Sequence, residues 1–326
     1  MIKAFRIFSE EGKVKGRVVS MDENELSPGN VVIRVRYSGV NFKDALAGAG
    51  AGLILKKFPL NGGIDAAGVV ETSSDSRFKP GQEVLVNGTG IGENFDGGYA
   101  EKLRVSADSI VPKPEGLTLK EAMLLGTAGF TAALAIHRME VNGQTAAKGP
   151  ILVTGASGGV GSFAVQILAQ AGYEVIAVSG KSSAQTYLQE LGATEVIAPD
   201  DLNLGNRPLE SVKFGGVIDN VGGELLAKAI AHTQLWGNVS SIGLTASSEL
   251  NTTVMPFILR GVSLLGVSSN NCPMDMRKQI WNRLGAEWKP RHLEKVLAKT
   301  LTLDDLPQAF QDLLQRKVTG RMVVVL

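Results

Sequence analysis

The chain has 326 residues, of which 44% are hydrophobic and 20% are charged, and its formal net charge is +1. This length exceeds what a single core usually holds, so we expect two domains, and the balanced charge argues against nucleic-acid binding. Cys272 is the only cysteine, which excludes an internal disulfide and a cysteine-rich zinc site and is typical of a reducing compartment.

The N-terminal 20 residues show no targeting signal. They contain seven charged side chains and no uninterrupted apolar run, unlike a signal peptide. No segment approaches the roughly 20 consecutive apolar residues of a membrane span. We therefore expect a cytoplasmic protein with neither a membrane nor a nucleic acid as partner.

Residues 1 to about 115 contain short apolar runs separated by turn sequences, a pattern typical of antiparallel strands. The clearest strand, 31–37, follows the turn 27–30, which is Ser-Pro-Gly-Asn. Further short strands are expected at 69–70, 83–86 and 99–105. Their spacing favours a rolled antiparallel barrel over alternating βα units.

A helix is predicted from Leu119 to Met139. Thr118 as its N-cap and Glu121 three residues later form a capping box. Gly126 and Gly129 interrupt the helix. They indicate either a hinge or ligand approach, or simply close packing against a neighbouring helix.

From residue 149 to about 267 strands alternate with helices, which indicates a doubly wound parallel sheet. Strands are expected near 151–154, 174–178, 195–198, 214–219, 237–242 and 262–267, and helices near 159–171, 183–191 and 223–234. Helices at 274–284 and 303–315 follow, and we expect the final strand, 321–326, to return to the first domain. The predicted domains are 1–124 with 268–326, and 125–267.

The stretch 151–161, Ile-Leu-Val-Thr-Gly-Ala-Ser-Gly-Gly-Val-Gly, places a short buried strand before a glycine-rich turn and a helix. The glycines let the backbone turn sharply and approach a ligand, and the helix N-terminus attracts a pyrophosphate. This context predicts a dinucleotide site. The alternative is a glycine turn that only packs well.

The next strand of this sheet ends in Ser179-Gly180-Lys181-Ser182, and no acidic residue lies between 175 and 189. Sites that prefer NAD usually present Asp or Glu there to the ribose hydroxyls. Hydroxyl groups and an ammonium suit a 2′-phosphate instead, so we predict NADPH over NADH. Alternatively Lys181 is a solvated residue at a helix start. Tyr187 either closes over the phosphate or only packs nearby.

The glycine spacing also fits the short-chain dehydrogenases, which need a catalytic Tyr-x-x-x-Lys. The residues four positions after the four tyrosines are Asn41, Leu103, Ala177 and Leu191. None is a lysine, so this alternative fails.

Six ordered blocks resemble the zinc-free quinone oxidoreductase branch of the medium-chain dehydrogenases/reductases. They are Ser38–Ala47, Gly62–Gly68, Gly126–Ala132, Val153–Gly161, Thr253–Val262 and Val318–Arg321. Within that branch the chain resembles the NADPH-dependent acryloyl-CoA reductases, often labelled quinone oxidoreductases. The resemblance implies an α/β fold in which a Rossmann NADP-binding domain joins a β-rich, GroES-like catalytic domain. It also implies a homodimer, with 264–267 as a candidate edge strand paired across the two-fold axis.

Zinc alcohol dehydrogenases of this superfamily bind zinc through an early Cys and a His-Glu pair near Gly63. This chain has Val40-Asn41 and Ile64-Asp65 there, and its three histidines, 137, 232 and 292, are not spaced as ligands. We therefore expect no metal and no zinc-alkoxide chemistry. His137 is interpreted as a helix residue without a chemical role.

The resemblance implies three catalytic residues. Asn41 is the first candidate, because its amide can donate and accept near the nicotinamide ribose or the substrate. Asp44 fits orientation of the loop better than acid–base catalysis. Phe42 stands where relatives commonly carry Tyr. Because Phe cannot donate a proton, stacking against the nicotinamide is the role left to it.

The resemblance also implies a set of cofactor contacts. Asn270 follows a strand and is placed beside the nicotinamide, and Arg321 is a candidate for a phosphate of the cofactor or of acyl-CoA, unless it is a surface arginine. The full set is Thr131, Ser157, Gly158, Gly159, Val160, Ser179, Gly180, Lys181, Asn220, Gly243, Leu244, Ile258, Ser269, Asn270 and Arg321.

The implied reaction is NADPH-dependent reduction of the C=C bond of a small α,β-unsaturated acyl-CoA, with hydride transferred to the β-carbon. Charge then develops on the thioester oxygen, which needs hydrogen-bond donors, and the α-carbon takes a proton from solvent or a side chain. Arg260, Lys289 and Arg291 are candidate cations for the CoA phosphates. Two alternatives remain: an NADPH:quinone reductase, and an NADPH-binding sensor or structural module without turnover.

Overall fold

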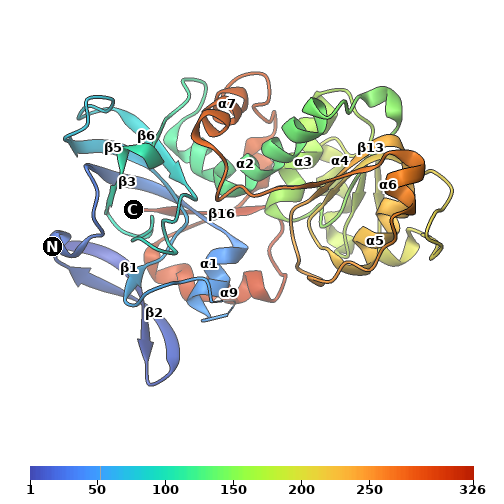
Figure 1. Ribbon diagram of the computed structural model, residues 1–326. Helices are drawn as coiled ribbons and strands as arrows, with labels where there is room; N and C mark the ends of the chain where they lie inside the picture. The colour runs from blue at the N-terminus through green and yellow to red at the C-terminus, as the bar shows by residue number, and fades with distance from the viewer. Residues whose placement is uncertain (52) are drawn as a thin grey trace. The chain divides into compact units, whose positions relative to one another are not determined.

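The computed structural model describes residues 1–51 and 53–326, which group into two compact units (Figure 1). Unit 1 comprises residues 1–127, 269–286 and 296–326, and unit 2 comprises residues 128–268 and 287–295. These units differ from the predicted domains by a few residues at the boundaries, 125–127 and 268, and in the segment 287–295, which clusters with unit 2. The functional assignment of the two parts stays a prediction at this point.

Unit 1 is built on two sheets. The smaller has the order β2-β1-β4, and the larger has the order β15-β16-β3-β5-β6-β8, with β7 also paired to β3. The strands are β1 (Ile2–Glu10), β2 (Lys13–Met21), β3 (Val31–Val40), β4 (Leu60–Asn61), β5 (Asp65–Ser73), β6 (Glu83–Asn87), β7 (Lys102–Val105), β8 (Val111–Pro112), β15 (Leu297–Leu301) and β16 (Arg321–Val325). The predicted return of the final strand is confirmed, because β16 lies between β15 and β3.

Short helices complete unit 1. They are η1 (Glu23–Glu25), α1 (Phe42–Gly48), η2 (Ala107–Ser109), α7 (Met274–Leu284), η6 (Leu303–Asp305) and α9 (Leu306–Leu314), while α8 (Leu293–Val296) lies at the second boundary between the units. The β1–β2 hairpin, α1 and β15 were not predicted from the sequence. It also started one strand at Tyr99, whereas β7 begins at Lys102. Tyr99 is instead fully buried as a packing residue.

Aromatic packing anchors the β1–β2 hairpin to the core of unit 1. The ring of Phe5 on β1 lies edge-on to Tyr99 at 6.4 Å and to Phe310 of α9 at 5.8 Å. Ala45 of α1 and Val324 of β16 belong to the same buried cluster. The core therefore joins segments from both ends of the chain.

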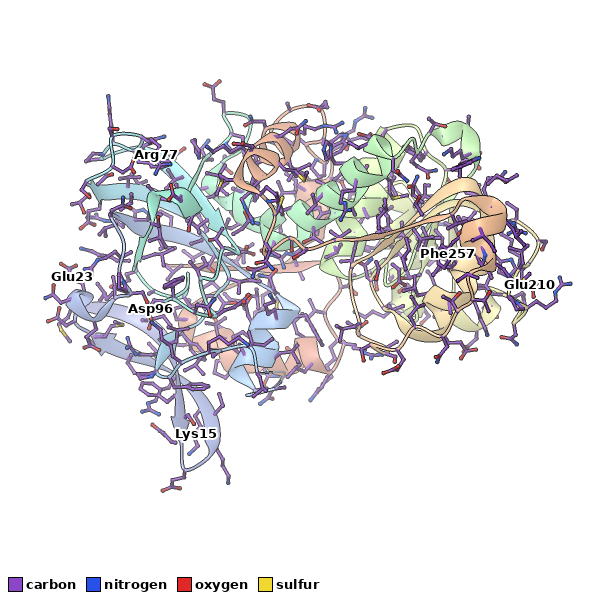
Figure 2. All side chains as sticks on the ribbon, viewed as in Figure 1. Lys15, Glu23, Arg77, Asp96, Glu210 and Phe257 are labelled. Atoms are coloured by element: carbon purple, nitrogen blue, oxygen red, sulfur yellow. The ribbon has the colours of Figure 1, made fainter. Side chains whose placement is uncertain are left out.

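The buried carboxylate of Asp96 is satisfied by donors within unit 1 (Figure 2). Its carboxylate accepts hydrogen bonds from the Ser27 N–H at 2.8 Å, the Ser27 hydroxyl at 2.9 Å and the Asn61 N–H at 2.9 Å. Such pairing offsets the desolvation of the charge, because a buried carboxylate without donors is strongly destabilising. Asp96 thus joins the 27–30 turn to β4.

Unit 2 is a six-stranded parallel sheet in the order β11-β10-β9-β12-β13-β14. Figure 1 shows helices flanking these strands, so the predicted doubly wound sheet is confirmed. Its strands are β9 (Ile151–Val153), β10 (Val175–Val178), β11 (Glu195–Ile197), β12 (Phe214–Asp219), β13 (Thr233–Ser241) and β14 (Ser263–Gly266). Its helices are η3 (Ala146–Lys148), α3 (Gly159–Gln170), η4 (Ser182–Ala184), α4 (Gln185–Glu190), η5 (Pro199–Asp201), α5 (Gly223–Ala231) and α6 (Met255–Arg260).

The long helix α2 (Leu119–Val141) is broken at Gly126, whose φ of 48° and ψ of −151° are not helical. The predicted capping box at its start is confirmed: the Glu121 N–H donates to the Thr118 hydroxyl, and the Thr118 N–H donates to the Glu121 carboxylate. Contrary to the sequence-based expectation, α2 is long and apolar enough to cross a membrane. However, 78% of its apolar window is buried inside the protein, as in a core helix.

We predict that Phe5→Ala destabilises the protein by about 3–5 kcal/mol, because it empties the contact with two aromatic rings. Phe8→Ala is the matched control. Phe8 lies on the same strand but is only half-buried under the Arg17 guanidinium, so its loss should cost about 1 kcal/mol or less. Urea unfolding of both variants measures the difference. Equal losses would show that the hairpin is not anchored through Phe5.

Candidate active site

The glycine turn of unit 2 has the geometry that its sequence predicts. β9 is fully buried at the centre of the sheet, Gly155 has a φ of 57°, and α3 begins at Gly159. A Cβ on Gly161 would lie 2.5 Å from both the Gly155 oxygen and the Ala156 Cα. Only glycine therefore lets α3 start this close to the turn, and the predicted strand–turn–helix is confirmed.

The ends of β9 and β12 are held together by polar side chains. The Thr154 hydroxyl donates to the Asp219 carboxylate at 2.7 Å, and the Asn220 amide donates to the Thr154 carbonyl at 2.8 Å. Burial raises the pKa of Asp219, while the bonds from Thr154 and from the Gly222 N–H lower it. Asn220 Oδ1 is buried and accepts no hydrogen bond within the described part of the chain. This oxygen is therefore an unpaired hydrogen-bond acceptor at this edge of the sheet.

The predicted phosphate contacts lie together beyond β10. The hydroxyls of Ser157 and Ser179 are hydrogen-bonded at 2.9 Å, and the Lys181 N–H donates to Ser179 Oγ at 3.2 Å. Burial lowers the pKa of the Lys181 ammonium. The Tyr187 hydroxyl donates to Ser162 on α3 at 2.8 Å, and burial raises its pKa to about 12. Tyr187 therefore packs against α3 in this state.

The other predicted cofactor residues of unit 2 differ in accessibility. Thr131 is buried on α2, whereas Gly158, Gly159 and Val160 are partly accessible at the start of α3. A Cβ on Gly243 would lie 2.1 Å from the Asn220 carbonyl oxygen. Two apolar side chains, Leu244 and Ile258, are 65% and 72% exposed. The exposed side chains of Leu244, which follows Gly243, and of Ile258, on α6, are therefore accessible to a ligand.

The candidate residues of unit 1 surround a buried carboxylate, Asp65, at the start of β5. Its Oδ2 accepts from Asn41 Nδ2 at 2.8 Å, and its Oδ1 accepts from the Thr127 hydroxyl at 2.6 Å. The Thr127 N–H donates to the same carboxylate, directly after the break in α2 at Gly126. The Arg321 guanidinium lies 3.6 Å from it, and both side chains are nearly inaccessible to solvent. Asp65 is therefore the hub of the site in unit 1.

The Asn41 amide is almost fully occupied. Its Nδ2 donates to Asp65 at 2.8 Å and to Asp44 at 3.0 Å, and its Oδ1 accepts from Arg321 at 2.8 Å. An amide has two hydrogens, so neither is available to a substrate oxygen in this arrangement. The expectation that Asn41 donates near the substrate is therefore not supported. One lone pair on Oδ1 remains as an acceptor.

Asp44 caps α1 and is buried. Its Oδ2 accepts from the Asn41 N–H at 2.8 Å, and its Oδ1 accepts from the Ile64 N–H at 2.9 Å. Burial, reinforced by the negative charge of Asp65, raises the pKa of Asp44 to about 7. Burial and the same two carboxylates raise the pKa of Tyr99 well above its usual value, so Tyr99 is neutral. The expected orienting role of Asp44 agrees with this geometry.

Arg321 is not placed as a phosphate ligand. It is 4% exposed, and it donates to the Leu124 carbonyl, the Val40 carbonyl and Asn41 Oδ1. A buried guanidinium with these partners cannot reach a solvent-exposed phosphate. The surface location is therefore contradicted, and the phosphate role stays a prediction that this arrangement does not support. Arg321 is instead the cation that compensates Asp65.

Phe42, Ser269 and Asn270 are accessible in unit 1. The Phe42 side chain starts α1 and is 37% exposed, so its ring is available for stacking. Ser269 and Asn270 are partly buried in the segment before α7.

The three candidate cations for CoA are not equivalent. Arg260, at the end of α6, donates to the carbonyls of Ala231, Thr233 and Glu210, so its guanidinium is already bonded to the backbone and the phosphate role is not supported. Figure 2 labels Glu210 and Phe257 of this region. Lys289 is half-buried and Arg291 is exposed, and their role stays a prediction.

Sequence reasoning missed Asp65, Tyr99 and Thr127 as members of the site. Asp65 stood inside a quoted block, and an acid at the start of an apolar, buried strand was a signal that a partner cation must exist. The partner itself, Arg321, is 256 residues away in sequence (321 − 65), so no local pattern could identify it. Tyr99 and Thr127 carry no comparable signal.

Two family models match the chain. Residues 27–115 match the alcohol dehydrogenase GroES-like domain, and residues 159–285 match a family described as zinc-binding dehydrogenase. The first match lies in unit 1, and most of the second lies in unit 2.

Three relatives match almost end to end. The acrylyl-CoA reductase AcuI of Ruegeria pomeroyi is 45% identical over 97% of this chain and 96% of its own. YhfP of Bacillus subtilis, provisionally named a quinone oxidoreductase, is 44% identical. Its structure with bound NAD superposes on this chain with a TM-score of 0.97, and the match covers 100% of this chain and 99% of YhfP. Escherichia coli YhdH with bound NADPH is 44% identical, with a TM-score of 0.95 and 99% of each chain covered.

The zinc of the family description does not fit this chain. Among residues 1–51 and 53–326, no group of three His, Cys, Asp or Glu side chains could hold a metal ion. At the expected ligand positions Asp65 is committed to Arg321, Asn41 and Thr127, and Val40 and Ile64 carry no ligand atoms. His232 is bonded to the Ser211 carbonyl and the Gly205 N–H, and burial lowers its pKa.

The GroES-like and dehydrogenase matches, the parallel sheet with its glycine turn, and identities of 44–45% over nearly the whole length agree. The chain therefore belongs to the medium-chain dehydrogenase/reductase family, in the group that includes AcuI, YhfP and YhdH.

Proposed function

We propose that the chain is an NADPH-dependent reductase of the C=C bond of a small α,β-unsaturated acyl-CoA, and that units 1 and 2 are its catalytic and NADP-binding domains. The observation that carries the proposal is the polar edge beyond β9 and β10. This edge contains the glycine turn, the hydrogen-bonded Ser157–Ser179 pair and Lys181, whose N–H donates to Ser179. No acidic residue lies between 175 and 189. This chain is 45% identical to the acrylyl-CoA reductase AcuI over 97% of its length, and this similarity supports the substrate class.

NADPH is favoured over NADH on electrostatic grounds. Among the similar solved structures, two YhdH proteins are described with NADP and NADPH, and YhfP is described with NAD. In this chain Lys181 supplies positive charge, and Ser179 and Ser157 supply hydroxyl donors. A 2′-phosphate is recognised by that combination, whereas a free ribose is recognised by a carboxylate.

When bound, NADPH supplies the hydride for the β-carbon of the substrate. Asn41 and Asp44 are positioning residues, because their polar atoms are used to hold the start of α1 against Asp65 and Ile64. Phe42, at the first position of α1, offers an apolar ring to the nicotinamide. Asp44 is buried among its donors, so the α-carbon takes its proton from water.

A quinone reductase is the second candidate, and it is favoured by the name given to YhfP and by the exposed Phe42 ring, which would also stack on a quinone. An NADPH-binding module without turnover remains the alternative of another class.

We further propose a cytoplasmic homodimer. β14 is an edge strand of the sheet in unit 2, and Leu264 is exposed on it, which supports pairing across a two-fold axis.

The reaction is tested by following NADPH absorbance with acryloyl-CoA, crotonyl-CoA and benzoquinone in parallel, with NADH as the control cofactor. We expect turnover of acryloyl-CoA with NADPH. Turnover of benzoquinone alone would move the assignment to quinone reduction. A melting temperature raised by NADPH, with no substrate consumed, would support the binding module and exclude both enzymes.

We predict that Lys181→Ala weakens NADPH binding by about 10- to 100-fold, because a charge-assisted contact to the 2′-phosphate is lost. NADH has no such phosphate, so its affinity should not change. The Kd of each cofactor, measured by fluorescence titration, gives the comparison. Lys213→Ala, an exposed lysine elsewhere in unit 2, is the control. An equal loss for both cofactors would contradict a phosphate role for Lys181.

Asp44 makes stability depend on pH. Because its pKa is about 7 in the folded protein, above its unfolded value, the folded state binds the proton more tightly. This contribution to stability is complete below the unfolded pKa and is lost as the pH rises through about 7. Between pH 5.5 and 8.0 the loss is about 2 kcal/mol.

We therefore predict that Asp44→Asn, although destabilised overall, loses less stability than the native protein between these two pH values. Urea unfolding followed by tryptophan fluorescence measures both slopes. Asp275→Asn, an exposed carboxylate in unit 1, should retain the native slope. If Asp44→Asn and the native protein show the same slope, the buried proton resides elsewhere.

A further inference from the structure

Three phenylalanine rings of unit 1 are exposed, although a large apolar side chain stabilises a protein mainly by being buried. Phe42, the first residue of α1, is 37% exposed, and Phe58 and Phe95 are 42% and 43% exposed. Exposed apolar side chains that gather on one face commonly mark a binding site. The contacts between their segments decide whether these three rings share such a face.

These segments contact one another within unit 1. The Lys43 ammonium lies 2.8 Å from the Glu93 carboxylate, and the Glu93 carbonyl accepts from the Lys56 N–H at 2.9 Å. The Lys57 ammonium lies 5.9 Å from the centre of the Phe95 ring. The exposed members of these segments form a lysine–phenylalanine patch, which consists of Phe42, Lys56, Lys57, Phe58 and Phe95.

The turn that carries Phe95 is held firmly by its own backbone. The Phe95 N–H donates to the Gly90 carbonyl at 3.1 Å, and the Phe95 carbonyl accepts from the Gly92 N–H at 2.8 Å. Gly92 has a φ of 68°, and a Cβ there would lie 2.8 Å from the carbonyl group of Gly63. The backbone beneath the exposed ring is therefore fixed before a ligand arrives, which reduces the entropy lost on binding.

The patch carries positive charge that no nearby acid compensates. Glu93 is paired with Lys43. Lys56 and Lys57 are exposed, and neither ammonium forms an ion pair within residues 1–51 and 53–326; the Lys56 ammonium donates only to the Leu53 carbonyl, at 3.3 Å. Cations beside an exposed aromatic ring are the groups that bind the phosphates and the base of a nucleotide. Two cations suit one phosphorylated nucleotide, whereas a nucleic acid needs a longer basic surface.

We propose that the lysine–phenylalanine patch binds the phosphorylated adenosine end of CoA, with the Phe95 ring against the adenine and with Lys56 and Lys57 against phosphate groups. The inference rests on the proposed function and deepens it, because it names a surface of unit 1 that recognises the carrier of the acyl group. Phe42 belongs to the same patch and offers an apolar contact to the pantetheine arm. Neither lysine is among the cations that the sequence suggested for this role.

The test compares three ligands that differ in the nucleotide. CoA has the whole nucleotide, dephospho-CoA lacks the 3′-phosphate, and pantetheine lacks the nucleotide altogether. Isothermal titration calorimetry measures the Kd of each with NADP⁺ at saturating concentration, so that the proposed dinucleotide site of unit 2 is already filled.

Two variants address the two kinds of contact. The double variant Lys56→Ala/Lys57→Ala removes the cations, and Phe95→Ala removes the ring. Lys79→Ala is the control for charge, because Lys79 is an exposed lysine of unit 1 outside the patch. Phe8→Ala is the control for the ring, because Phe8 is a half-buried phenylalanine of unit 1 outside the patch.

We expect the native protein and both controls to bind CoA about 100-fold more tightly than pantetheine. Each patch variant should lower this ratio to about tenfold, with the Kd of pantetheine unchanged. The double lysine variant should also lose the preference for CoA over dephospho-CoA, and added salt should weaken CoA binding less in it than in the native protein. A general loss of structure would weaken pantetheine as well, so the ratio separates recognition from stability.

Native-like ratios in the two patch variants overturn the inference, and turnover of acryloyl-CoA by the native protein then leaves the proposed function intact. If the double variant does not fold, Lys57→Gln takes its place, and a native-like ratio in that variant overturns the inference equally. Failure of the native protein to reduce acryloyl-CoA with NADPH overturns the proposed function, and the inference falls with it.

Discussion

The structure of unit 1 depends on one buried ion pair, Arg321 with Asp65. Neither charge would be tolerated alone at this depth, because desolvation of a single buried ion destabilises a protein by several kcal/mol. Together they fix the end of β3, the start of α1 and the break in α2, since Asn41 and Thr127 bond to the same carboxylate. Loss of either charge would leave the other without compensation. The geometry of the candidate site is therefore a by-product of charge neutralisation.

In unit 2, hydrogen bonds between polar side chains, and no ion pair, order the candidate site in the part of the chain that the structure describes. The carboxyl ends of the parallel strands in this unit must present polar atoms to a ligand without collapsing onto one another. Thr154, Asp219 and Asn220 form a local network that spaces β9 from β12, and the Ser157–Ser179 contact does the same between β9 and β10. The edge is consequently ordered before any ligand arrives, which reduces the entropy lost on binding. Lys181 adds a positive charge beside this edge, and in the proposed function that charge distinguishes NADPH from NADH.

The sequence predicted the parts of the fold that depend on short-range patterns. The glycine turn, the alternation of strands and helices in unit 2 and the Thr118 capping box all follow from residues within a few positions of one another. The β1–β2 hairpin was missed because the buried run of β1 includes Arg6, which breaks the expected alternation. α1 has seven residues, too few for a helical period to show. The partners of Asn41 and Arg321 could not be predicted for another reason: they lie far away in sequence, and only the folded chain shows which donors are already used.

The position of β16 has a consequence for how the protein is made. β16 lies between β15 and β3, so the larger sheet of unit 1 cannot close until the last strand has been translated, and Asp65 has no counter-ion until then. Residues 128–268, by contrast, form most of unit 2 without interruption. During synthesis unit 2 can therefore fold first, while β3 has an open sheet edge on the side that β16 later covers. A chain released before β16 is made would contain a folded unit 2 and an incomplete unit 1 with an unpaired strand edge. Such an edge is prone to aggregation, so we expect chaperones and proteases to act on this species.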